Sequence, residues 1–189
     1  MKLLSLILFI TVLINFANAN SYLTIIPKGS DSCGETYGVG YYLPMGTCIS
    51  VNDWNLSINQ VNGSHIQISY LGPNCSSDSP INYAYAINEC VNFQFLDSPY
   101  TFSSIFSISD SVPTDAVVYN YYYYSYYCSG PTYSIFFTNG FSNNFSKFMC
   151  VDKKPEVFLC SGTGDCTQID TDGCTNGKGV DMPYRVTCN

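Results

Sequence analysis

Short apolar stretches alternate with polar positions over most of this chain, and glycine, proline, asparagine, aspartate and serine interrupt them at close intervals. The clearest case lies between Leu56 and Leu71, where apolar residues take alternate positions on both sides of Asn62-Gly63. Such alternation is typical of a strand with one buried face, and Asn-Gly between two such segments is a strong hairpin signal. We therefore predict a β-hairpin over residues 54–71.

Similar segments recur along the rest of the chain, whereas helical periodicity is nearly absent after residue 19. These segments are rich in β-branched and aromatic residues, which favour strands. Many short strands without intervening helices predict an all-β fold, an antiparallel sandwich or irregular barrel. The further strands that we expect are 38–43, 81–87, 90–95, 103–109, 116–127, 133–138, 147–151, 156–160 and 184–188.

Residues 1–19 have the features of a secretory signal peptide. Lys2 gives a positive start, residues 3–16 are apolar, and Ala17-Asn18-Ala19 has the small residues of a cleavage site. No second apolar stretch of the roughly 18 residues that a membrane helix needs follows. We expect cleavage after Ala19, secretion from the cell and no membrane insertion.

All ten cysteines lie after this segment. An even number of cysteines in an exported chain predicts disulfides, and their spacing matches no paired zinc motif. Because closing a short loop costs less entropy, local pairs are expected. We predict a disulfide-stapled main domain over 20–150 and a small cysteine-rich C-terminal appendage over 151–189. The expected pairs are Cys33–Cys48, Cys75–Cys90 and Cys128–Cys150, with Cys160, Cys166, Cys174 and Cys188 pairing among themselves.

Charged side chains are few and mostly acidic, with a formal net charge of −7 at pH 7. No lysine or arginine occurs between Lys28 and Lys147. Nucleic acids and anionic membranes are bound through basic side chains, so neither is an expected partner. The same stretch offers trypsin no cleavage site.

Four Asn-x-Ser sequons are candidate acceptors for N-linked glycans in an exported chain. They begin at Asn55, Asn62, Asn74 and Asn144. At Asn74 the middle residue is Cys75, whose disulfide formation can compete with glycosylation. We expect a glycoprotein whose glycans supplement its sparse surface charge.

The segment from Tyr119 to Cys128 contains seven tyrosines in ten residues. As a strand it would carry Val118, Asn120 and Cys128 on one face, which is the expected core face. Two interpretations stay open for the other face. Either it is also buried, or it is an exposed aromatic surface for a sugar or a protein. The candidate contacts for such a ligand are Tyr119, Tyr121, Tyr123 and Tyr127.

Catalytic signatures are missing from the sequence. The single histidine, His65, follows the Asn62-Gly63 turn, where we expect it to be exposed rather than held in a triad. Asp165, Asp170 and Asp172 cluster without the ligand pattern of a calcium loop. We therefore expect no cofactor, no metal and no enzymatic activity, although a pair of carboxylates could serve a glycoside hydrolase.

These observations predict a secreted, disulfide-rich glycoprotein that binds a carbohydrate or an extracellular protein. The alternative is a structural or protective protein of an extracellular matrix or coat. A secreted glycoside hydrolase is the third possibility.

Overall fold

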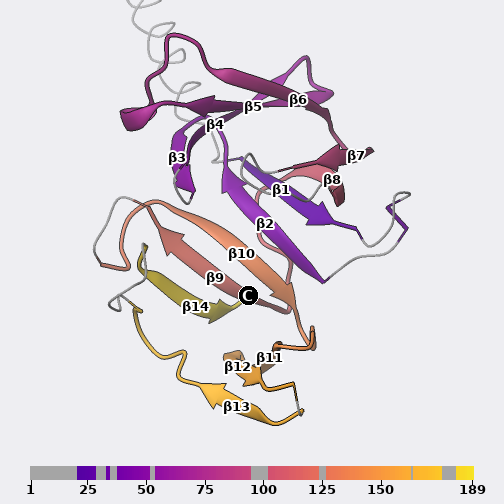
Figure 1. The fold of residues 1–189 in the computed structure, drawn as a ribbon, viewed down its shortest axis with the longest axis vertical. Helices are drawn as coiled ribbons and strands as arrows, with labels where there is room; N and C mark the ends of the chain where they lie inside the picture. The colour runs from indigo at the N-terminus through magenta and orange to yellow at the C-terminus, as the bar shows by residue number, and fades with distance from the viewer. Residues whose placement is uncertain are drawn as a thin grey trace, which may run out of the picture.

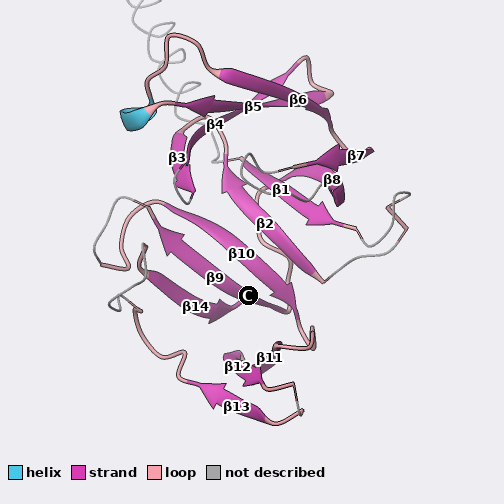
Figure 2. Ribbon diagram, in the orientation of Figure 1, coloured by secondary structure: helices cyan, strands magenta, loops and turns pink. Residues whose placement is uncertain are grey.

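The computed structural model describes residues 21–28, 33–34, 38–51, 54–94, 102–123, 127–162, 164–175 and 182–189. The expected signal peptide lies outside the described residues. Within them the chain forms strands, turns and a single 3-10 turn, η1 (Pro73–Cys75), with no α-helix (Figure 2). The all-β expectation is confirmed.

Every strand pairing is antiparallel, and the strands form three sheets (Figure 1). The seven-stranded sheet has the order β14 (Tyr184–Cys188), β9 (Ala116–Tyr122), β10 (Thr132–Thr138), β2 (Val39–Pro44), β1 (Tyr22–Pro27), β8 (Phe102–Ser109) and β7 (Cys90–Phe93). The four-stranded sheet consists of β3 (Cys48–Val51), β4 (Trp54–Val61), β5 (His65–Leu71) and β6 (Ile81–Ala86). The three-stranded sheet consists of β11 (Ser146–Val151), β12 (Lys154–Cys160) and β13 (Cys166–Ile169).

The hairpin expected over residues 54–71 is confirmed as β4 and β5. Leu56 and Ile58 lie opposite Tyr70 and Ile68, and all four side chains are buried. The chain reverses through positive φ angles at Asn62 (55°) and Gly63 (70°), which asparagine and glycine adopt most readily. The local turn chemistry and the alternation therefore specify the same register.

One face of the seven-stranded sheet packs against both smaller sheets. Ile25 and Phe106 of this face meet Ile58 and Ile66 of the four-stranded sheet in the largest apolar cluster. Val117, on the same side of β9 as Tyr121, joins a second cluster with the three-stranded sheet. In Figure 1 the four-stranded sheet lies above the large sheet and the three-stranded sheet below it. The two cores thus share one continuous sheet face.

The opposite face of the seven-stranded sheet carries a smaller cluster, formed by Tyr42, Ala116, Val118 and Phe136. Gly40 lies beneath the Phe136 ring, and a Cβ at this position would be 2.3 Å from Phe136 Cζ. A side chain at residue 40 would therefore displace that ring. Both faces of β9 are consequently covered by apolar contacts.

Two of the expected disulfides are wrong because the four cysteines exchange partners. The observed bonds are Cys33–Cys90 and Cys48–Cys75, in place of Cys33–Cys48 and Cys75–Cys90. Cys33 follows β1, and only β8 separates β1 from β7, where Cys90 lies. Cys75 lies in η1, which contacts β4, the neighbour of the β3 strand that carries Cys48. Sheet neighbours rather than short loops decide these pairs.

The expected Cys128–Cys150 bond is also wrong, since Cys128 pairs with Cys174 and Cys150 with Cys188. Of the last four cysteines, only Cys160 and Cys166 pair with each other. The cause is β14, which returns to pair with β9 and brings Cys188 beside the three-stranded sheet. The residues after 150 are therefore divided between two sheets: β12 and β13 pair with β11, and β14 forms an edge of the large sheet.

Candidate functional site

The tyrosine-rich segment does not continue as one strand, because β9 ends at Tyr122. Tyr119 and Tyr121 lie on the inner face of the large sheet. The Tyr119 ring contacts those of Phe137 and Phe148 edge-on, and both tyrosines contact Tyr184. Burial raises the pKa of both phenols above its ordinary value, helped by the neighbouring Tyr184. Both residues are therefore half-buried among neighbouring rings, Tyr119 beside β11 and β14 and Tyr121 beside β10 and β14, rather than fully exposed on an outer face.

The other two candidate tyrosines lie beyond β9 and apart from each other. Tyr127 is 73% exposed. Tyr123 is 8% exposed and lines an open groove, in which Tyr127 takes no part. The structure therefore does not bring the four candidate residues together on one surface, and it places Tyr123 in a different kind of site.

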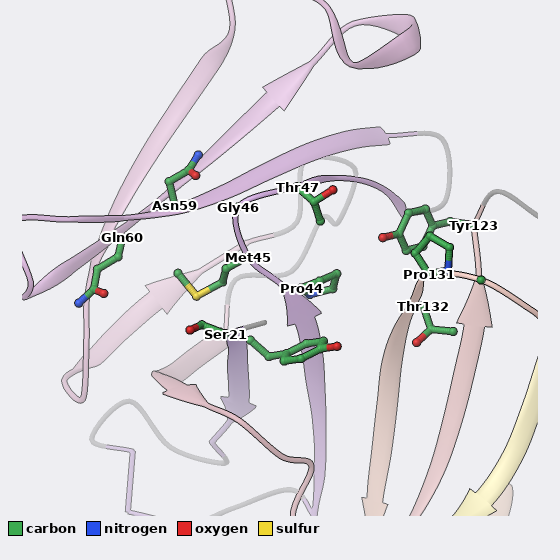
Figure 3. Close-up of a pocket in the computed structure, with 12 residues that line it drawn as sticks. Ser21, Pro44, Met45, Gly46, Thr47, Asn59, Gln60, Tyr123, Pro131 and Thr132 are labelled. Atoms are coloured by element: carbon green, nitrogen blue, oxygen red, sulfur yellow. The ribbon is translucent and has the colours of Figure 1, made fainter. Parts of the chain in front are cut away.

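The groove has a volume of about 750 Å³ and lies between the large sheet and the four-stranded sheet (Figure 3). One wall is formed by Asn59 and Gln60 of β4. The middle is formed by the start of β1 and the β2–β3 loop, and the far wall by Tyr123 with the start of β10. The lining consists of Asn59, Gln60, Ser21, Tyr22, residues 44–47, Tyr123 and residues 130–132.

Backbone hydrogen bonds hold the middle of the groove against its β4 wall. The Met45 N–H donates to the Ser21 carbonyl oxygen at 2.9 Å, and the Gly46 N–H donates to the Ile58 carbonyl oxygen at 2.8 Å. Gly46 has a φ of 71°, which glycine adopts without strain. The loop is therefore linked to the residue before β1 and to β4 by two backbone hydrogen bonds.

Among the described residues that line the groove there is no lysine, arginine, histidine, aspartate or glutamate. Its polar groups are two carboxamides and the hydroxyls of Ser21, Thr47 and Thr132, and its rings are those of Tyr22 and Tyr123. The Asn59 and Gln60 amides each use one N–H for a local bond, to Ser57 Oγ and to the Gly63 carbonyl oxygen, both at 3.0 Å. Their amide oxygens can accept from ligand hydroxyls.

Tyr22 has a fixed ring orientation. It stacks on Tyr42 with the centroids 4.2 Å apart and the planes at 11°. A ring held in this way contacts a ligand with little loss of side-chain entropy. The groove thus combines held aromatic surface with neutral hydrogen-bonding groups, which is the chemistry that sugars require.

The features expected of a catalytic site are not assembled in the described part of the chain. His65 is exposed at the start of β5, with Nδ1 2.9 Å from Ser64 Oγ. The buried polar residues are threonine and serine, and none of the described carboxylates is buried. No group of three possible metal ligands occurs among the described residues.

The four sequons occupy different environments. Asn62, Asn74 and Asn144 are exposed. Asn55 is half-buried within β4, between β3 and β5, and its Nδ2 donates to the Gly72 carbonyl oxygen at 3.1 Å. Asn144 lies in a turn in which Asn143 Oδ1 accepts from the Phe145 and Ser146 N–H groups, both at 2.8 Å. Three of the four are thus placed where an oligosaccharide could be attached.

The family model of counting factor-associated protein A/B/C matches residues 1–189, and the chain belongs to this family. No curated protein and no solved structure matches the chain. The five disulfides and the family together indicate an extracellular protein. None of the described residues forms a helix with the length and apolar character needed to cross a bilayer.

Proposed function

We propose that this member of the counting factor-associated protein family is a secreted glycoprotein that acts by binding, and that its groove takes an uncharged carbohydrate. The observation that carries the proposal is the described lining of the groove, which has two tyrosines, two carboxamides and the hydroxyls of Ser21, Thr47 and Thr132 but no charged side chain. Its volume of about 750 Å³ lies within the range of small-molecule sites.

The arrangement of the groove supports an extended ligand. Figure 3 shows Asn59 and Gln60 at one end, with their amides pointing in opposite directions, and Tyr123, Pro131 and Thr132 at the other. An oligosaccharide can place the apolar face of one ring on an aromatic side chain while the hydroxyls of another ring reach the amides. A charged ligand would find no opposite charge among the described lining side chains to offset its desolvation.

Two observations favour binding over the alternatives. Among the described residues that line the groove there is no carboxylate that could act as acid, base or nucleophile, which supports a binding role over glycoside hydrolysis. All ten cysteines are paired within the chain. They leave no thiol for links between molecules, which favours a binding protein over a disulfide-linked matrix or coat.

The proposal is tested with a panel of neutral oligosaccharides and a double variant, Asn59→Ala with Gln60→Ala. We expect saturable binding to part of the panel. The affinity of the variant should be lower by about tenfold or more, which corresponds to the loss of one or two hydrogen bonds to the ligand. Gln168→Ala is the matched control, because it removes an exposed amide from β13 outside the groove. Absence of binding to any neutral saccharide, or equal binding by both variants, would overturn the proposal.

A second candidate function is association with another protein, which the family description names. The observation that favours it is β6, an edge strand of the four-stranded sheet without any charged residue. Ile81 is 51% exposed and Tyr83 is 42% exposed on this strand. Edge strands without charge or proline can accept a strand from a partner.

This second function has its own test, which is co-purification with the counting factor of the family description. Tyr83→Lys places a charge on the edge strand and should abolish co-purification, whereas Asn59→Ala with Gln60→Ala should not. Retention of the complex by the Tyr83 variant would exclude β6 as the contact.

A further inference from the structure

We infer that the groove binds an N-linked glycan, and that its first occupant is the glycan carried by Asn62 of the same molecule. This inference rests on the proposed function of the groove and names its ligand. The carbohydrate on Asn62 would then compete with any external glycan for the same site.

The geometry that carries the inference is the link between Gln60 and the turn that follows β4. Gln60 lines the groove, and its Nε2 donates to the Gly63 carbonyl oxygen at 3.0 Å. Gly63 directly follows Asn62, which is exposed in the turn. Asn62 is two residues beyond Gln60, about 7 Å along an extended chain. An oligosaccharide attached there therefore begins next to the groove wall.

The chemical groups of an N-linked glycan also match those of the groove lining. N-linked glycans built of mannose and N-acetylglucosamine carry no charge, and neither do the described side chains that line the groove. Their hydroxyls and acetamides match the amides of Asn59 and Gln60 and the hydroxyls of Thr47 and Thr132. None of the lining residues that the structure describes carries a charge that would have to be desolvated when such a glycan enters.

Attachment to the same molecule makes even weak binding effective. A ligand on a short flexible tether has an effective concentration in the millimolar range. A groove whose dissociation constant is about tenfold below this effective concentration would thus be about nine-tenths occupied by its own glycan. An external oligosaccharide must displace this glycan. Its apparent affinity is therefore reduced in proportion to the fraction of molecules whose groove is free.

The sequon at Asn144 provides the matched comparison. Asn144 is exposed in a turn, as Asn62 is, but its turn precedes β11 of the three-stranded sheet. No residue of that sheet lines the groove. Both sequons can be abolished at their third residue, by Ser64→Ala and by Ser146→Ala. These changes leave both asparagines in place, so the positive φ of Asn62 is not given to another side chain.

The test uses the full secreted protein made in a host that attaches neutral high-mannose glycans, with occupancy of both sequons measured by peptide mass spectrometry. The affinity for a soluble high-mannose oligosaccharide is then compared among the intact protein, the two variants and the enzymatically deglycosylated protein. We expect Ser64→Ala and the deglycosylated form to bind at least about tenfold more tightly than the intact protein and Ser146→Ala.

The contrary outcomes separate the inference from the function on which it rests. If the deglycosylated protein binds but Ser64→Ala equals Ser146→Ala, the groove binds glycans and the Asn62 glycan does not occupy it. If mass spectrometry finds no glycan on Asn62 of the secreted protein, the inference that this glycan occupies the groove also fails. If the deglycosylated protein binds no neutral oligosaccharide of any kind, the carbohydrate function of the groove fails as well.

Discussion

Tyr121 stacks on Tyr133 of the neighbouring strand, with the ring centroids 5.1 Å apart and the planes at 13°. The pair lies on the face of the large sheet that packs against the smaller sheets, and both phenols have a pKa above the ordinary value because they are buried. The most conspicuous aromatic run of the sequence is thus partly a core element, and the stability of the fold depends on it.

Replacing tyrosines of this run should separate structural from exposed positions. We expect Tyr121→Ser to lower the free energy of unfolding by about 3 kcal/mol, because it removes a packed ring and leaves a cavity. Tyr127→Ser, at a position that is 73% exposed, should change it by no more than about 0.5 kcal/mol. Urea unfolding measures both; equal effects would contradict the placement of Tyr121 in the core.

Alkaline pH should destabilise the protein from about pH 10 upward. Burial, with contributions from Tyr22 and Asp110, raises the pKa of Tyr42 from 10.0 to about 12. Between these values the unfolded chain loses the phenolic proton while the folded chain keeps it, so ionisation favours unfolding. The urea midpoint should therefore fall between pH 10 and 12. Tyr42→Phe should reduce this fall.

Glycan occupancy should follow the exposure of the sequons. We expect modification of Asn62 and Asn144 in the secreted protein and none at Asn55, whose side chain is half-buried in a central strand and bonded to Gly72. Mass spectrometry of glycopeptides, with chymotrypsin as the protease, measures each site. A glycan on Asn55 in most molecules would contradict the pairing of β4 with β3 and β5.

The distribution of basic residues predicts an unusual digest. Lys28 and Lys147 flank a stretch without lysine or arginine. After reduction and unfolding, trypsin should release residues 29–147 as one large fragment, whereas chymotrypsin should cut the same stretch at many aromatic residues. Electrophoresis and mass measurement of the digest test this prediction, and rapid tryptic cleavage between residues 29 and 146 would refute it.

The Cys150–Cys188 bond joins the three-stranded sheet to β14 of the large sheet. Because 38 residues separate the two cysteines, the bond restricts the unfolded chain substantially. Replacing both by alanine should reduce stability by about 2–4 kcal/mol. The same change at Cys160 and Cys166, only six residues apart, should cost less. Thermal unfolding compares the two double variants.

The sequence predicted those elements whose structure depends on residues close together in the chain. The β4–β5 hairpin follows from alternation and from the Asn62-Gly63 turn. β1 was not expected, because Leu23, Thr24 and Ile25 are all buried and the strand has no alternation to detect. The Cys128–Cys174 and Cys150–Cys188 pairs depend on β14 returning to β9, which no local signal specifies.

The groove was beyond sequence reasoning for the same reason. Ser21, Asn59 and Thr132 come from three separate segments and meet only after the sheets have packed. Tyr123 was the one groove residue among the four candidate tyrosines. Its neighbours in the sequence, Tyr119 and Tyr121, serve the core instead.

The central claim, that the groove is a carbohydrate site, is tested most directly by titrating the deglycosylated protein with neutral oligosaccharides and following its backbone amides by NMR. We predict saturable shifts at Thr47, Gln60 and Thr132 and none in β12 or β13. The absence of saturable shifts, or shifts confined to residues outside the groove, would contradict the account.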